Sequence, residues 1–275
     1  MSIEPGLYIV ATPIGNLGDL SPRARDVLAE VDVIAAEDTR HSGKLLAHFG
    51  IPTPQVSFHE HNERERSPEL LARLERGDSV AVISDAGTPL ISDPGLPLVR
   101  AARAAGVPVR AVPGPSAFVA ALSVSGIPTD RFTFEGFLPP RQAARRKRLD
   151  ELAHEPRTLI FYESPHRIAA TLQDMATAFG GERHACIARE LTKLYETVRT
   201  GPLATLVSEA EMEARGEWVV VIAGDPTPSG PQVADLDRML AVLMAELPLK
   251  QAVSLTAKLT GAPRNEVYAQ ALARK

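Results

Sequence analysis

Short apolar runs, each followed by a polar loop and then by a stretch with helical spacing, recur along the first part of the chain. They cover residues 7–11, 31–36, 55–58, 79–83 and 107–112. Runs of this length that end in Gly, Pro, Asp or Ser indicate strands, and the apolar spacing after the loops indicates helices. Strands that alternate with helices predict a mainly parallel sheet with helices on both faces. Ligands of such sheets bind where the strands end.

Serine followed by proline marks two of the expected helix starts. Ser21-Pro22 and Ser67-Pro68 each combine an N-cap with a proline in the first turn, which suits the beginning of a helix. We therefore expect one helix after Ser21 and another from Ser67-Pro68 through Arg76. Ser116 is the expected N-cap of a helix over 118–125.

A second series of apolar runs begins after the turn cluster Gly126-Ile127-Pro128. A helix is expected up to Phe179, and four further strands are expected over 132–135, 158–162, 184–188 and 218–223. These elements predict a second α/β unit.

The end of the chain has a different character. Residues 224–231 hold three prolines and two glycines, which is typical of a linker. Three helical segments over 236–247, 249–259 and 263–273 follow, and they predict either a packed appendage or an arrangement like a helix-turn-helix. The expected domains are residues 1–116, 117–226 and 232–275.

Composition excludes several classes of protein. The formal net charge is -4, so any nucleic-acid partner has to be met by a local basic patch. Cys186 is the single cysteine, which excludes an internal disulfide and a thiolate zinc cluster. No stretch approaches about 18 uninterrupted apolar residues, so we expect a cytoplasmic protein that does not enter a membrane. His59-Glu60-His61 lacks the spacing of a metal motif, and no metal is expected.

The loop after residues 79–83 holds the densest group of candidate residues. Asp85 and Asp93 are set between prolines and two glycines, and Gly87 and Gly95 allow the backbone to approach a ligand closely. The alternative is a plain turn closed by Asx hydrogen bonds. Neither a dinucleotide fingerprint nor a phosphate-binding P-loop occurs in the chain.

Two other polar stretches carry competing interpretations. Glu37-Asp38-Thr39-Arg40 follows a strand and suits a site, but Asp38 or Thr39 could instead cap the next helix. Residues 141–148 hold five basic side chains, which indicates either a solvated helix face or contacts with phosphates. These five are Arg141, Arg145, Arg146, Lys147 and Arg148.

Taken together, the loops resemble one known family. The stretches are Thr12-Pro13-Ile14-Gly15 within residues 7–19, then 36–40, Ser84-Asp85-Ala86-Gly87-Thr88-Pro89 within 84–91, and 113–116, 135–139, 162–167, 188–193 and 247–250. Their order and spacing resemble the bacterial small-subunit ribosomal RNA (cytidine-2′-O)-methyltransferases, a family of the tetrapyrrole-methylase superfamily. The resemblance covers nearly the whole chain.

The resemblance implies an architecture and a ligand. It implies two α/β domains with S-adenosylmethionine folded into the cleft between them, a C-terminal helical extension and a homodimer. The substrate is expected to be 16S ribosomal RNA or the small ribosomal subunit, methylated on a cytidine ribose. The residues expected to bind the methyl donor are Thr12, Pro13, Gly15, Ala86, Gly87, Thr88, Pro89, Ile91, Ser116, Ala117, Tyr162 and Leu191.

Methyl transfer to a ribose hydroxyl requires alignment of donor and acceptor and removal of a proton from a weakly acidic alcohol. Asp38, Glu37 and Asp85 are the candidate bases, with His59 and Glu163 also possible. Arg40 and Arg167 are expected to grip the substrate phosphate, and the basic side chains of 141–148 are expected to contact RNA.

Two alternatives stay open at this point. The chain could be another enzyme of the superfamily, acting on a tetrapyrrole or a modified protein side chain, or an RNA-binding relative without catalysis. A dinucleotide oxidoreductase is a distant third, because the fingerprint is missing.

Overall fold

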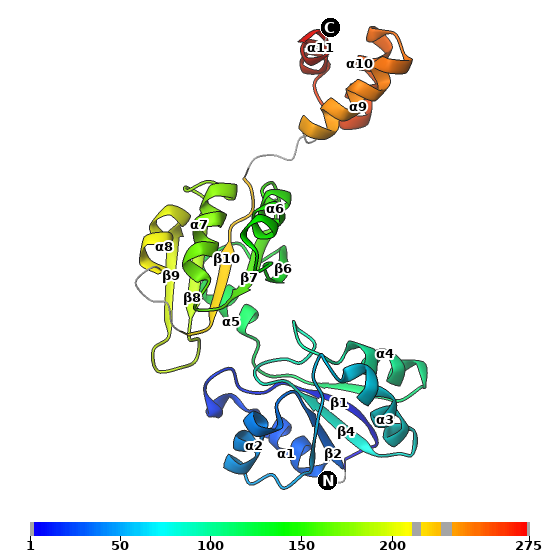
Figure 1. Ribbon diagram of the computed structural model, residues 1–275, viewed down its shortest axis with the longest axis vertical. Coiled ribbons are helices and arrows are strands. Elements are labelled where there is room, and N and C mark those ends of the chain that lie inside the picture. The colour runs from blue at the N-terminus through cyan, green and yellow to red at the C-terminus, as the bar shows by residue number, and fades with distance from the viewer. Residues whose placement is uncertain (1–2, 211–215, 227–232, 274–275) are drawn as a thin grey trace. The chain divides into compact units, whose positions relative to one another are not determined.

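The computed structural model describes residues 3–210, 216–226 and 233–273. The chain forms two compact units, Met1–Glu151 with Arg157–Ala223 and Leu152–Pro156 with Gly224–Lys275. The larger unit contains two five-stranded sheets, which Figure 1 shows in blue to cyan and in green to yellow. The predicted α/β fold with a helical extension is confirmed.

The first sheet is entirely parallel. Its strands, in the order β3-β2-β4-β1-β5, are β3 (Gln55–Ser57), β2 (Val33–Ala36), β4 (Ser79–Ile83), β1 (Gly6–Val10) and β5 (Val109–Val112). Each neighbouring pair is parallel, as the alternation of strands and helices predicted. Every residue of β2 and β4 is buried, which is why these strands read as unbroken apolar runs.

Helices cover both faces of this sheet. On one face, α1 (Pro22–Glu30) and α2 (Thr39–His48) pack Leu28 and Leu46 against alternate strand residues. On the other face, α3 (Glu63–Glu75) and α4 (Leu96–Ala104) pack Leu70 and Leu98 against the intervening residues. The helices that follow β1 and β4 therefore lie on opposite faces, and the gap between these two neighbouring strands is the topological switch point of the sheet.

The predicted start of α3 was wrong. The helix begins at Glu63, four residues before Ser67, and Pro68 lies inside it. Glu63 and Glu65 occupy the first turn, where negative charge interacts favourably with the helix N-terminus. The Ser67 hydroxyl donates back to the Glu63 carbonyl, so this serine acts within the helix and does not cap it.

The second sheet is mixed. Its order is β6-β7-β10-β8-β9, and only β6 (Phe132–Phe137) and β7 (Thr158–Glu163) pair in parallel. β10 (Trp218–Ile222) lies antiparallel to β7 and to β8 (His184–Arg189). Helix α5 (Ala117–Val124) packs Ala121 and Leu122 on this sheet. The remaining helices are α6 (Gln142–Leu152), α7 (Ile168–Phe179) and α8 (Leu203–Ala210).

The strand β9 (Thr197–Pro202) was missed in the sequence, as was α8. Within the described residues, β9 is an edge strand paired with β8, and its first four residues alternate between partly buried and exposed. Val198 is its one strongly apolar residue, so a search for apolar runs gives no signal.

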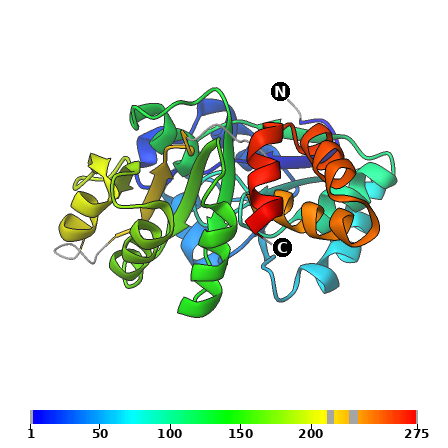
Figure 2. The same ribbon diagram turned by 90° about the horizontal axis from the view of Figure 1, so that it is seen from above.

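The smaller unit is a cluster of three helices, drawn in orange and red in Figure 2. These are α9 (Val233–Glu246), α10 (Leu249–Thr260) and α11 (Arg264–Ala273), close to the predicted segments. They bury Leu240, Val253 and Val267 completely. The predicted linker falls partly on residues 227–232, which lie outside the described residues. Within the described ranges, no helix combines the length and the apolar character needed to cross a bilayer.

Candidate functional site

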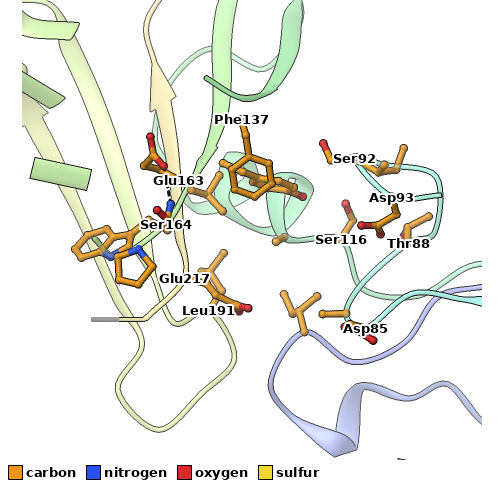
Figure 3. Close-up of a pocket in the computed structure, with 18 of the residues that line it drawn as sticks. Asp85, Thr88, Ser92, Asp93, Ser116, Phe137, Glu163, Ser164, Leu191 and Glu217 are labelled. Atoms are coloured by element: carbon orange, nitrogen blue, oxygen red, sulfur yellow. Dashed lines mark hydrogen bonds between the residues drawn. The ribbon is translucent and has the colours of Figure 1, made fainter. Parts of the chain in front are cut away.

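Loops at the strand ends of both sheets line one cavity of about 360 Å³ within the larger unit (Figure 3). This volume lies at the lower end of the range for small-molecule sites, roughly 300–1,000 Å³. The first sheet and its connection to α5 contribute Ile14, Glu37, Asp85, Ala86, Thr88, Ile91, Ser92, Asp93, Ser116 and Ala117. The second contributes Phe137, Tyr162, Glu163, Ser164, Pro165, Leu191, Glu217, Trp218 and Val219.

The loops after β1 and β4 are bonded to each other at the switch point. The amide of Thr12 donates to the carbonyl of Gly87 at 2.9 Å, and the Gly87 amide donates back to the Thr12 carbonyl at 3.1 Å. Gly87 has φ +81°, and a Cβ there would lie 3.3 Å from Ile14 Cγ2. A side chain at this position therefore strains the backbone and presses on Ile14 before it reaches the cavity.

Side-chain hydrogen bonds connect the β4 loop to the loop that follows β5 and to the loop that follows β1. The Thr88 hydroxyl donates to the Pro115 carbonyl at 3.0 Å, and the Thr12 hydroxyl donates to the Ser84 carbonyl at 3.2 Å. These bonds fix the backbone beside Ser116 and Ala117, which both line the cavity. The first-sheet wall is therefore a rigid assembly of three loops.

Strained backbone conformations flank two cavity-lining residues, Ile91 and Leu191. Ile91 lies between Leu90 (φ 72°) and Ser92 (φ 65°), and Leu191 lies between Glu190 (φ 51°) and Thr192 (φ 68°). These four are the non-glycine residues with positive φ in the described part of the chain. Each such conformation costs about 1 kcal/mol or more and persists only where the surroundings enforce it. Both strained loops present an apolar side chain to the cavity, Ile91 from the first sheet and Leu191 from the second.

Glu37 and Asp85 line the cavity but are bound to main-chain amides. A Glu37 carboxylate oxygen accepts the Asp85 amide at 3.3 Å, and Asp85 Oδ1 accepts the Asp38 amide at 3.1 Å. Burial raises the pKa of Glu37, and the nearby charge of Asp85 acts in the same direction. These two side chains therefore hold the ends of β2 and β4 together at the edge of the cavity.

Asp93 is the third carboxyl group of this wall, and it has a different environment. It is partly buried, and burial raises its pKa to about 6, assisted by the negative charges of Glu37 and Asp85 and opposed by a hydrogen bond with Ser84. Among the described residues, no main-chain amide is bound to its carboxylate. Asp93 was identified in the sequence as a carboxylate of this loop but not as a candidate base, because its burial and its lack of a main-chain amide partner within the described ranges are visible only in the structure.

Asp38 is outside the cavity lining, and the helix-cap alternative is the arrangement observed. Its Oδ1 accepts the Arg40 amide at 2.8 Å at the start of α2, and its carboxylate pairs with the Arg40 guanidinium at 3.1 Å. Hydrogen bonds from Arg40 lower the pKa of Asp38 to about 2. Arg40 is 89% exposed, so its guanidinium is at the surface.

Tyr162 joins the second sheet to α5. Its hydroxyl oxygen accepts the Phe118 amide at 3.2 Å, and burial raises the pKa of Tyr162, with the charge of Asp93 adding to the shift. Glu163, which follows it, is 3% exposed and accepts the Ser164 amide and the Thr171 hydroxyl. Glu163 is therefore committed to holding the loop that follows β7.

Arg167 was predicted to grip phosphate, and its contacts oppose that role. Its Nη2 donates to the carbonyls of Leu138 and Pro139 at 2.8 and 3.1 Å and lies 3.4 Å from the Glu163 carboxylate. The side chain is 26% exposed. Arg167 fastens the loop after β6 to the loop after β7.

The basic segment runs from Arg141 into the helix α6, and the RNA contact predicted for Arg145 is not favoured by its surroundings. Its side chain is 5% exposed and pairs with Asp174, which is fully buried, at 2.7 Å. Burial acts to raise the pKa of Asp174, but hydrogen bonds from Arg146, Arg145 and Gln142 outweigh it and lower that pKa. Arg145 faces inward because Asp174 on α7 requires a buried cation.

The other cations of residues 141–148 differ in their availability. Arg146 is half exposed while it pairs with Asp174, and Arg148 pairs with Glu135 and Glu151. Arg141 and Lys147 are exposed, and no ion pair for either is found in the described part of the chain. These two are the cations of the segment that are free to meet an anion.

The structure brings most of the predicted catalytic and donor-binding residues to this cavity, and none of the predicted RNA-binding residues lines it. Those that line it are Glu37, Asp85, Ala86, Thr88, Ile91, Ser116, Ala117, Tyr162 and Leu191. Those that do not are Asp38, Thr12, Pro13, Gly15, Gly87 and Pro89. The roles predicted for all of these residues, inside the lining and outside it, stay predictions. Ser92, Asp93, Phe137, Glu217 and Trp218 also line the cavity, and the sequence did not single them out as ligand-binding. Within the described residues, no group of three His, Cys, Asp or Glu side chains could hold a metal ion.

Residues 6–207 match the sequence model of a protein family, the tetrapyrrole (corrin/porphyrin) methylases. The chain belongs to this family. A second model, described as the RsmI C-terminal HTH domain, matches residues 230–275.

Two relatives narrow the family further. A protein of Xylella fastidiosa named ribosomal RNA small subunit methyltransferase I is 56% identical over 271 residues, which are 98% of this chain and 99% of that protein. A Pseudomonas aeruginosa protein of the same name is also 56% identical, over 274 residues, 98% of this chain and 97% of its own length. The resemblance to small-subunit ribosomal RNA methyltransferases that the sequence indicated is confirmed.

A solved structure supports the fold. The uroporphyrin-III C-methyltransferase of Thermus thermophilus, complexed with S-adenyl homocysteine, superposes with a TM-score of 0.56 at 20% identity, over 79% of this chain and 97% of that chain.

Proposed function

We propose that the chain transfers a methyl group from S-adenosylmethionine to the 2′-hydroxyl of a cytidine in 16S ribosomal RNA. The observation that carries the proposal is one cavity, lined by strand-end loops of both sheets, in a methylase whose 56% identical relatives are named for small-subunit ribosomal RNA. The tetrapyrrole alternative has no comparable support, because the solved tetrapyrrole methylase is only 20% identical.

The cavity residues suit S-adenosylmethionine, which supplies an electrophilic methyl group when bound. Ile91 and Leu191 offer apolar contacts for an adenine ring, and Thr88 and Ser116 offer hydroxyls. Asp85 and Asp93 place negative charge where a ligand with a sulfonium and an ammonium group carries positive charge. The strained loops hold Ile91 and Leu191 in place before the ligand arrives, which reduces the ordering cost of binding.

We assign the removal of the hydroxyl proton to Asp93. Glu37 and Asp85 are occupied by main-chain amides, Asp38 caps α2, and Glu163 is bound by Ser164 and Thr171. Among the described residues no main-chain amide is bound to Asp93, whose carboxylate has a hydrogen bond with the Ser84 side chain, and with a pKa of about 6 it is ionised at neutral pH yet more basic than an ordinary aspartate. As the methyl group transfers, the ribose oxygen loses its proton to the Asp93 carboxylate.

The oligomeric state and the cellular location are inferred from the family resemblance. We infer that the chain is a cytoplasmic homodimer, with residues 1–116 supplying most donor contacts, residues 117–226 closing the cavity and residues 232–275 contacting RNA. Val119, Val124, Leu194 and Tyr195 are exposed apolar side chains on the second half, which supports a protein partner there.

The function is tested by locating the transferred methyl group. Small ribosomal subunits from cells that lack this chain are incubated with the purified protein and S-adenosylmethionine carrying a labelled methyl. Free 16S RNA and a tetrapyrrole precursor serve as parallel substrates. After digestion to nucleosides, label is expected in 2′-O-methylcytidine. Label on a base, or only in the tetrapyrrole, would contradict the proposal.

The RNA contacts proposed for residues 141–148 give a separate prediction. Replacing Arg141 and Lys147 together by alanine removes two exposed cations and is expected to weaken RNA binding several-fold. Each lost phosphate contact lowers the slope of log affinity against log salt by about 0.7 to 0.9, so the double variant is expected to lose about 1.5. The matched control replaces Arg76 and Arg103, two exposed arginines at the ends of α3 and α4. If the wild type and the Arg141/Lys147 double variant had equal salt slopes, these two side chains would not contact RNA phosphates.

A further inference from the structure

Phe137 presents an exposed aromatic ring at the cavity. The register of β6 against β7 shifts between Phe134 and Gly136, and Gly136 has φ +64°. A bulge of this kind re-aims the side chains that follow it. Phe137, the last residue of β6, lines the cavity and is 56% exposed (Figure 3).

The Phe137 ring is the outer member of a row of aromatic side chains. It lies 5.6 Å from the Tyr162 ring, which lies 5.0 Å from Phe134, which in turn lies 4.8 Å from Phe118. Burying a phenylalanine side chain is favourable, so an exposed ring supported by a row of partly buried rings indicates a surface for a ligand.

The same bulge brings β6 against the loop that carries the proposed base. A Cβ on Gly136 would lie 3.1 Å from Ser92 Oγ, so the backbone of Gly136 approaches the residue just before Asp93. Phe137 follows Gly136 in the chain and Asp93 follows Ser92, so Phe137 and Asp93 lie on adjacent backbone segments. Both residues line the cavity. A nucleoside that reaches Asp93 with its ribose therefore has its base near Phe137.

The charges of the side chains that line the cavity indicate which part of a nucleotide enters it. Glu37, Asp85, Asp93 and Glu217 line the cavity and disfavour a phosphate inside it. Exposed cations that can meet phosphates lie at the surface: Arg40, which pairs with Asp38, and Arg141 and Lys147, which have no ion pair within the described residues. We propose that the base of the target nucleotide stacks on Phe137 while its phosphates stay outside with these cations. This inference rests on the proposed function.

The experiment compares Phe137→Ala with Phe137→Tyr in methylation of small subunits. Base stacking on an aromatic side chain contributes about 1–3 kcal/mol, so kcat/KM for RNA is expected to fall about 5- to 150-fold in the alanine variant and to stay near wild type in the tyrosine variant. A fluorescent cytidine analogue at the target position is expected to be quenched by the wild type and not by Phe137→Ala. S-adenosylhomocysteine affinity and melting temperature are expected to be unchanged.

The matched control is Phe132→Ala, an aromatic side chain on the same strand that is 41% exposed and does not line the cavity. Its kinetics are expected to be those of the wild type. An unchanged kcat/KM in Phe137→Ala would overturn the inference, and so would a selective loss of S-adenosylhomocysteine affinity, which would assign the ring to the donor. Failure of the proposed function gives a different result, because the wild type would then form no 2′-O-methylcytidine.

Discussion

Asp93→Asn is expected to lower kcat for RNA methylation by about 100-fold or more, because a positioned general base contributes about 10²–10⁴ to the rate. The substitution keeps the shape of the side chain and removes its capacity to accept a proton. In the wild type, kcat/KM is expected to rise with pH up to about 6 and then level off, since the pKa of Asp93 is about 6 and its ionised form is the active one. Steady-state rates from pH 5 to 8 measure both effects.

The same variant is expected to be more stable than the wild type at neutral pH. The folded-state pKa of Asp93 is raised from 3.8 to about 6, so its contribution to stability is complete below pH 3.8 and is lost as pH rises through about 6. The shift corresponds to about 3 kcal/mol at most, and since Asp93 is partly exposed we expect a gain of about 1 kcal/mol in the free energy of unfolding. A gain in stability together with a loss of kcat separates catalysis from a structural role.

Asp38→Asn is the comparison for this prediction. Asparagine also caps helices, so the variant is expected to fold normally and to retain its kcat within about twofold. If Asp38→Asn abolished methylation while Asp93→Asn retained it, the base assigned here would be wrong.

Arg145→Ala is expected to lower the free energy of unfolding by about 3–5 kcal/mol, because it removes the buried cation that pairs with the buried Asp174 carboxylate and leaves that carboxylate to the half-exposed Arg146. For a chain of this size the melting temperature is expected to fall by about 10 °C. Chemical denaturation and thermal unfolding measure the effect. Lys147→Ala, on the same helix but exposed, is expected to change stability by less than about 0.5 kcal/mol.

The contrast between these two variants decides what the basic segment does. A stable Arg145→Ala protein with weakened RNA binding would contradict the structural role assigned to this arginine. The distinction also limits the design of multiple variants. Neutralising Arg145, Arg146 and Arg148 together removes the buried cation as well as surface charge, so a loss of RNA binding in that variant would report loss of folding.

The strands and their loops could be predicted because their signals are local. Buried parallel strands such as β4 are unbroken apolar runs, and the glycine and proline corners that follow them mark the edge where ligands bind. The edge strand β9 lacks an apolar run, and the start of α3 depended on charges in its first turn, so both escaped detection.

The chemistry of individual side chains could not be predicted, because it depends on contacts between distant residues. Asp85 and Asp93 look alike in the sequence, but Asp85 accepts an amide from the end of β2 and Asp93 does not. Arg145 and Lys147 belong to one basic run, yet only Arg145 meets a buried carboxylate on α7. Family resemblance located the loops, and three-dimensional contacts separate the functional side chains from the structural ones.

The central claim is that loops from both sheets form a single site for the methyl donor. Hydrogen exchange of the wild-type chain, with and without S-adenosylhomocysteine, tests it without any substitution. The account predicts slower exchange in two separate segments, residues 84–93 of the first sheet and 188–193 of the second. Binding that protects only one of these segments, or neither, would contradict it.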